Sequence, residues 1–349
     1  MVYQLTCTSI SIFLNLVLIL LIWRKSPPQT GRYRWLMTFT ACFEIFWGAF
    51  DLPAEIIAHS VGCAFITFRV NTPDAVLDPE HSSWVVLTYT AIFGASMAVF
   101  AAHFIYRYGS IEPSFGKKFT SGWKFGLLFL FPIFYSFWWA AVVRIWFWKN
   151  PDMDEYTRDV INRTVGQPIE NISYIGTKFY NFGANGTMSF NTPAWIGVSQ
   201  MWFMVGTSVG CVFGFGTLCY LRLSGTLAIV SNAFNNLQKQ LFYALVLQTV
   251  IPLVLMHTPI TVFFLCPMLN IDTDFATALI LITIALYPAI DPLPSFFIIK
   301  SYREAMLDVF KAILCVPTHP PQVGVSLASV NSVGQFNHSM MLKKVNSAQ

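Results

Sequence analysis

Residues 6–23 read TCTSISIFLNLVLILLIW, a run of 18 residues that contains no charged side chain. About 20 helical residues, each rising ~1.5 Å, cross the ~30 Å hydrocarbon core of a bilayer. Backbone polar groups inside that core must be satisfied internally, and a helix does this within one segment. The stretch therefore predicts a membrane-spanning helix.

Six further blocks of the same kind follow along the 349 residues. The whole chain is 55% apolar and only 11% charged, whereas a soluble domain carries about a quarter charged residues. We predict an all-α membrane protein, a seven-transmembrane helix bundle within residues 1–316. The predicted spans are 6–23, 35–58, 84–106, 125–148, 194–221, 241–266 and 275–299.

The connecting segments differ in charge. Those on the side of the C-terminus carry 15 basic and 3 acidic residues, and the opposite ones carry 5 basic and 10 acidic residues. Basic residues that flank spans stay in the cytoplasm. The difference predicts a cytoplasmic C-terminus and an extracellular N-terminus in the plasma membrane.

The long connection 149–193 supports this orientation, because it holds three glycosylation sequons, at Asn162, Asn171 and Asn185. Sequons mark surface segments that pass through the secretory pathway. We predict that these three asparagines carry glycans.

Residues 300–314, KSYREAMLDVFKAIL, alternate apolar and charged positions with helical spacing. They predict a short helix in the membrane interface, in contact with lipid. The Ser- and Asn-rich residues 317–349 predict a disordered cytoplasmic tail.

Nothing in the sequence indicates an enzyme. HExxH, GxSxG and Gly-rich phosphate-loop motifs are absent, and no His/Cys cluster has metal-ligand spacing. We predict neither a metal nor a cofactor, and no nucleic-acid partner. Cys63 and Cys266 fall near the outer face, where a disulfide and a free pair of thiols both remain open.

Polar side chains inside spans are costly and therefore suggest function. Asn15, Glu44 and Asp291 each lie ~12–14 Å from the cytoplasmic end of their span, so three helices contribute to one polar level. Two interpretations remain open: a clamp between helices, or a site for water and a cation. Asp51 and Glu55 fit either a ligand cavity or a solvated helix end.

Small residues and prolines mark contact and bending points. Gly206, Gly210 and Gly214 recur every four residues and predict close helix packing, within the bundle or in a homo- or hetero-dimer. Prolines at 252, 259, 288, 292 and 294 permit kinks in the last two spans.

Two long motifs resemble a known family. The seventh span reads Tyr287-Pro-Ala-Ile-Asp291-Pro292, and the sixth begins with residues 237–252, LQKQLFYALVLQTVIP. Together with Tyr106-Arg107-Tyr108 at the end of the third span, they resemble the nematode seven-transmembrane chemoreceptors of the Str superfamily. The resemblance extends from the first span to about residue 311.

The resemblance implies a G-protein-coupled fold and a chemosensory, odorant-type receptor in the cilium of a sensory neuron. Its partners would be a heterotrimeric G protein and a small odorant or pheromone. Arg107 matches the arginine that engages the G protein in rhodopsin-like receptors, but Ile105 and Tyr106 precede it where an acid is usual. The residues assigned to coupling and activation are Tyr106, Arg107, Tyr108, Lys239, Gln240, Tyr287, Asp291 and Pro292.

A small, largely apolar ligand would occupy the outer half of such a bundle, since ligand pockets are mainly apolar with a few polar groups. The candidate lining residues are Tyr89, Phe93, Gln200, His257 and Thr283. Two alternatives to a signalling receptor remain open: a ligand-gated channel or transporter, and a non-signalling partner receptor of the same fold.

Overall fold

The computed structural model describes residues 2–71, 77–183, 185–225, 232–271 and 274–314. Within them, six helical segments are long and apolar enough to cross a membrane. The first four are α1 (Val2–Lys25), α3 (Pro79–Ile111), α5 (Leu127–Trp146) and α7 (Thr192–Gly225). The other two combine α8 (Asn232–Pro252) with α9 (Thr258–Met268), and α10 (Asp274–Ile290) with α11 (Leu293–Ile298).

Helix α2 (Tyr33–Ala54) completes a bundle of seven. It carries Glu44 and Asp51 in its interior and is not among the six segments named above. The helix ends at Ala54, four residues before the predicted end at 58, because Glu55 adopts a left-handed backbone with φ of 51°. The chain then enters a strand, so this predicted boundary was wrong.

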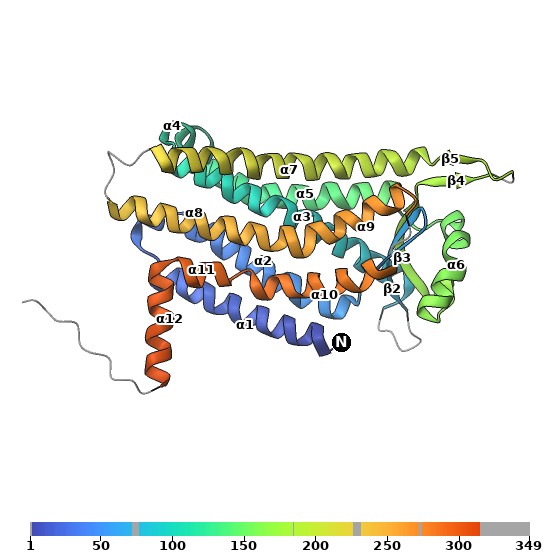
Figure 1. Cartoon of the computed structure of the whole chain (residues 1–349), viewed down its shortest axis with the longest axis horizontal. Helices are drawn as coiled ribbons and strands as arrows, with labels where there is room; N and C mark the ends of the chain where they lie inside the picture. The colour runs from blue at the N-terminus through green and yellow to red at the C-terminus, as the bar shows by residue number, and fades with distance from the viewer. Residues whose placement is uncertain (1, 72–76, 184, 226–231, 272–273, 315–349) are drawn as a thin grey trace, which may run out of the picture. The chain divides into compact units, whose positions relative to one another are not determined.

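Helix α3 forms the centre of the bundle. Most residues in its most apolar stretch are buried, whereas few of those in α7 are. Figure 1 shows α3 lying among α5, α7 and α8, with α1 and α2 on the other side. Gly94 permits the close contact with α5, because a Cβ atom there would lie 2.5 Å from Cβ of Trp139. The central helix thus contacts α2, α5, α7 and α8.

The last two spans bend at their prolines. A π-helical segment, Leu253–His257, separates α8 from α9, and Pro259 follows in the first turn of α9. Helix α10 ends at Ile290, and α11 starts after Pro292. Proline removes one backbone hydrogen bond and its ring displaces the preceding turn, which explains both interruptions.

A small sheet at one end of the bundle was not predicted. Strands β1 (Ile57–Val61), β2 (Ala64–Val70) and β3 (Ile172–Lys178) pair antiparallel in that order. Beside them lie α6 (Pro151–Val165) and a hairpin of β4 (Tyr180–Phe182) and β5 (Met188–Phe190). We call this the sheet end, and the opposite end, where α3 finishes and α8 begins, the basic end (Figure 1).

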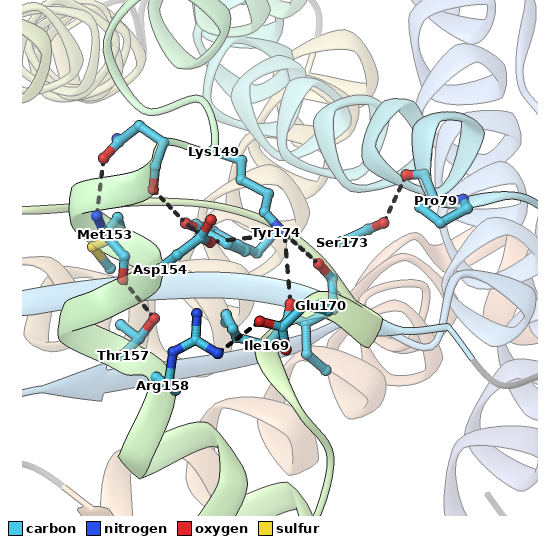
Figure 2. A network of polar contacts seen from close by, with 12 residues as sticks. Pro79, Lys149, Met153, Asp154, Thr157, Arg158, Ile169, Glu170, Ser173 and Tyr174 are labelled. Atoms are coloured by element: carbon cyan, nitrogen blue, oxygen red, sulfur yellow. Dashed lines mark hydrogen bonds and ion pairs between the residues drawn. The ribbon is translucent and has the colours of Figure 1, made fainter.

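Side-chain hydrogen bonds hold the sheet end together. The Tyr174 hydroxyl in β3 donates to the Asp154 carboxylate in α6 at 2.7 Å, and the Ser173 hydroxyl donates to the carbonyl of Pro79 at 2.7 Å (Figure 2). Arg158 pairs with Glu170 at 2.6 Å. Strand β3 therefore connects α6 to the first turn of α3.

One further helix follows the seventh span. Helix α12 (Lys300–Ile313) follows α11, as residues 300–314 predicted, and its Leu307, Phe310 and Ile313 side chains are exposed. Contacts within the chain divide it into Met1–Met306 and Leu307–Gln349; the predicted tail 317–349 lies outside the described residues. Short helical turns connect the other elements. At the basic end these are Pro28–Thr30, Pro113–Phe115, Gly116–Thr120 and Gly122–Gly126. Ile169–Asn171 is a similar turn at the sheet end.

Candidate functional site

Arg107 is buried at the basic end, with 1% of its surface exposed. Its guanidinium lies 4.8 Å from the centre of the Tyr33 ring, and Nη2 donates to the backbone carbonyl of Gln238 at 2.8 Å. Among the described residues Arg107 forms no ion pair, and Glu112, the next acid along the chain, pairs with Arg222 at 2.9 Å. The arginine thus connects α3 to α2 and α8 without a carboxylate.

Tyr33 is fixed by further contacts. Its hydroxyl hydrogen-bonds Nδ1 of His103 at 3.1 Å, and Thr40 hydrogen-bonds Nε2 of the same ring at 2.7 Å. The Tyr106 ring stacks on the Tyr33 ring with centroids 5.6 Å apart. Tyr108 faces elsewhere and packs against Phe215 in α7. The three residues of the predicted motif therefore make contacts with three different neighbouring helices.

The first turns of α8 contact the end of the seventh span. The Gln240 side-chain oxygen accepts a hydrogen bond from the backbone N–H of Lys300 at 2.8 Å. This N–H lies at the start of α12, where the first N–H groups have no partner within the helix. Lys239 beside it is half-buried. An outward movement of α8 would break this contact and that of Arg107 with Gln238.

Asn15, Glu44 and Asp291 come together in the middle of the bundle, each at most 2% exposed. The Asn15 amide donates to the carbonyl of Pro288 at 3.3 Å, and the Glu44 carboxyl group lies next to Asp291 and Asn15, with Glu44 Oε2 and Asp291 Oδ1 lacking a hydrogen-bond partner. Two carboxyl groups buried side by side cannot both ionise without a large cost, so they favour sharing one proton. The cluster borders a cavity of about 10 Å³, about the room of one water molecule.

Two residues that the sequence did not single out complete this cluster. The Gln248 amide donates to the Asp291 carboxylate at 3.2 Å, and the Ser295 hydroxyl donates to the Gln248 side-chain oxygen at 3.3 Å. Gln248 lies in α8, so the cluster connects the sixth span to the seventh. Tyr287 is buried one turn before Asp291 against Trp47, and Pro292 occupies the break between α10 and α11.

A cavity of about 50 Å³ lies between the bundle and the sheet. Tyr89 and Phe93, both predicted, line it together with Asp51, whose carboxyl group lies next to the Tyr89 hydroxyl. Asp51 is 6% exposed. It therefore belongs to a cavity wall, and the alternative of a solvated helix end is wrong for Asp51, whereas Glu55 is exposed.

Two predicted lining residues face away from this cavity. Gln200 borders a depression formed by α7 alone, with Trp195 and Phe203. Thr283 donates its hydroxyl to the carbonyl of Leu279, while Ile280 and Ile284 line the cavity. Counting residues along a span predicts how deep a side chain lies but not the face of the helix on which it lies, which explains both differences.

His257, the fifth predicted lining residue, lies beside Phe93 with ring centroids 5.9 Å apart. It occupies the end of the π-helical segment, and its Nδ1 atom is buried without a hydrogen-bond partner. The ring borders two further cavities but not the one beneath the sheet.

The structure decides between two alternatives that the sequence left open. Cys63 and Cys266 are free thiols, and Cys63 lies in the turn between β1 and β2 against the Tyr156 hydroxyl. Gly206, Gly210 and Gly214 have no atom of another helix near them, so packing within the bundle is wrong for these glycines. The three sequon asparagines are all exposed at the sheet end.

Six helices packed around α3, whose Arg107 is buried, define the class of seven-transmembrane helix bundles. The chain is similar to the crystal structure of squid rhodopsin, with a TM-score of 0.54 over 91% of this chain and 86% of that chain. The two sequences are 12% identical, so this likeness concerns the fold alone.

Sequence comparisons give the family. A family model described as serpentine type 7TM GPCR chemoreceptor Str matches residues 1–307. G-protein coupled receptor str-217 of Caenorhabditis elegans is 34% identical over 312 residues, 88% of each chain. Serpentine receptor class r-10 of Caenorhabditis briggsae is 28% identical over 311 residues, 86% of this chain and 87% of the relative. The chain belongs to the Str family of serpentine chemoreceptors and is a multi-pass membrane protein.

Proposed function

We propose that this receptor binds a small external chemical in the half of the bundle beneath the sheet and signals to a heterotrimeric G protein at the basic end. The contact of buried Arg107 with the Gln238 carbonyl of α8 at 2.8 Å carries the proposal. A ligand that favours a bundle with α8 displaced would break this contact and expose the arginine.

The proposed orientation places the sheet end outside the cell. The three exposed sequons and the acidic segments lie at that end, and the basic segments lie at the other. We further propose the plasma membrane of a sensory cilium as the location, in keeping with the chemoreceptor family.

The cavity beneath the sheet supports the proposed ligand class. Its lining is apolar except for a few groups such as Asp51 and Tyr89, and this mixture is typical of small-molecule pockets. At about 50 Å³ it is far smaller than the ~300–1,000 Å³ of ordinary ligand pockets. Binding would therefore expand the cavity, which couples occupancy to helix movement.

A calcium-reporter screen of odorant and pheromone panels in cells that express the receptor tests this proposal. We expect a response from the unmodified receptor and none from Arg107→Leu at equal surface density. Arg144→Leu is the matched control, because Arg144 is exposed near the sheet end and contacts the Trp148 ring. An undiminished response of Arg107→Leu would contradict the assignment.

A further inference from the structure

A second, larger cavity opens on the lipid-facing side of the bundle between α7 and α8. It has a volume of about 400 Å³ and is bordered by α3 at its floor. Phe104 and Phe242 form part of that floor, with ring centroids 6.3 Å apart. Because the chain spans a membrane, this α7–α8 groove faces hydrocarbon and not water.

The rim of the α7–α8 groove consists of exposed apolar and aromatic side chains. Phe213 and Tyr220 on α7 and Tyr243 and Val250 on α8 are between 43% and 63% exposed. The lining extends from Ser208 to Tyr220 along α7, a distance of ~18 Å at 1.5 Å per residue. An elongated apolar chain fits this shape better than a compact molecule.

The polar groups of the groove are few and uncharged. Ser208 donates to the carbonyl of Met97, and Thr249 donates to the carbonyl of Leu245. His257 differs, because its Nδ1 atom is buried and unpartnered. A buried polar group without a partner is costly, so the site favours a ligand that supplies a hydrogen bond there.

A small cavity lies between the groove and the cavity beneath the sheet. Met97 and His257 line both the groove and a small cavity of about 20 Å³. Phe93, Trp139 and Met201 line both that small cavity and the one beneath the sheet. These shared side chains therefore separate three successive spaces, which lead from the bilayer to the proposed binding site.

The sheet covers the same site from the other direction. Phe65 of β2 lines the cavity beneath the sheet and is 1% exposed. Its ring lies 4.8 Å from that of Phe264 and 5.3 Å from that of Phe147. Entry from water past this residue requires that packed aromatic rings separate.

We propose that an uncharged amphiphile, an apolar chain with one hydroxyl or carbonyl head, enters from the bilayer through the α7–α8 groove and places its head at His257. This inference rests on the proposed function and deepens it, since it names the ligand class and its route. The unpaired imidazole nitrogen selects the head, and the absence of charged side chains among the lining residues of the groove excludes ionised molecules.

Photolabelling tests the proposal on the purified receptor in phosphatidylcholine nanodiscs. The probe is hexadecan-1-ol with a mid-chain diazirine and a terminal alkyne, and mass spectrometry locates the label. We expect label within residues 208–220 and 242–257. Val209→Trp with Val250→Trp fills the rim and should reduce this label about tenfold. Leu218→Trp with Leu247→Trp, exposed on the same helices outside the groove, should leave it unchanged.

A second part of the experiment tests whether His257 binds the polar head of the probe. The alcohol probe should label the groove about 2- to 10-fold more than the matching alkane probe, and His257→Leu should abolish the difference while His257→Gln retains it. Label spread evenly over lipid-facing residues, or insensitive to the rim substitutions, would overturn the proposal. So would a phosphatidylcholine diazirine probe that labels the groove and is not displaced by hexadecanol, since the occupant would then be a resident lipid.

The labelling experiment needs no signalling, so the two proposals fail separately. A receptor that binds the probe at the groove but activates no G protein contradicts the proposed function alone. A receptor whose response to lipophilic agonists survives the rim substitutions contradicts the lateral route alone.

Discussion

The guanidinium of Arg107 in α3 lies over the ring of Tyr33 in α2, with 4.8 Å between the guanidinium carbon and the ring centre. A cation over an aromatic face contributes about 0.5–2 kcal/mol, with the upper value applying to desolvated pairs. The same arginine donates to a backbone carbonyl of α8. Both groups that Arg107 contacts at the basic end, a ring and a carbonyl, are therefore uncharged.

Central packing gives the first prediction. Gly94→Leu should lower the melting temperature of the purified receptor, because a Cβ atom at Gly94 already meets Trp139 and overpacking costs about 1–3 kcal/mol. Gly206→Leu is the control, since no atom of another helix lies near that position. A thermal shift assay in detergent measures both. Equal melting temperatures would contradict the α3–α5 contact.

The carboxyl cluster gives the second prediction. Glu44→Gln should keep the melting temperature nearly unchanged, because the amide can donate to Asp291 in place of the shared proton. Glu44→Ala leaves buried polar groups without a partner, at a cost of about 1–3 kcal/mol. That cost corresponds to a decrease of about 2–10 °C in a thermal shift assay. Equal melting temperatures of Glu44→Gln and Glu44→Ala would contradict the proposed role of Glu44 in the cluster.

Glycosylation gives the third prediction. Asn162 and Asn185 are exposed at the sheet end and should be occupied. Asn171 should be the least occupied, because its sequon residue Ser173 is 1% exposed and donates its hydroxyl to Pro79. Single Asn→Gln variants, compared by gel mobility before and after glycosidase treatment, measure each site. If no variant changes mobility, the proposed orientation is wrong.

The pH dependence of the sheet end gives the fourth prediction. The Arg158 guanidinium, hydrogen-bonded to Glu170, lowers the pKa of that carboxyl below its usual ~4.3 (Figure 2). A depressed carboxyl pKa contributes stability that is present above the unfolded value and is lost as pH falls through the folded value. The carboxyl carbon resonance of Glu170 should titrate below that of an unpaired glutamate. Arg158→Gln should raise the Glu170 pKa, and an unchanged value would contradict the pairing.

The sequence predicted the helical fold well, because the length and apolarity of a span are both properties of the chain alone. It missed the sheet at residues 57–70 and 172–178, in which β2 pairs with a strand about a hundred residues away. Strand signals are short, and the first two residues of β1 fell within the predicted span 35–58. The left-handed residue Glu55 has no sequence signal that distinguishes it from a helical glutamate.

The depth of a residue within its span was enough to predict the polar level. Asn15, Glu44 and Asp291 were placed at one level by counting residues, and the structure brings them together. No role was predicted for Gln248, although it lies within the quoted residues 237–252, or for Tyr33, which precedes the second predicted span, because both roles depend on helix rotation. The same limit explains Gln200 and Thr283, which have the expected depth and the wrong direction.

Ligand-independent G-protein activation by Tyr33→Leu is the most direct test of the central claim, and it requires no ligand. A panel of Gα dissociation sensors would compare Tyr33→Leu, Tyr33→Phe and Tyr33→Leu with Arg107→Ala at matched surface density. Loss of the ring contact should raise basal activation about 2- to 30-fold, and Phe should preserve the low basal level. The account predicts that the gain disappears in the double variant. Basal activation that does not change in Tyr33→Leu, or that persists without Arg107, would contradict it.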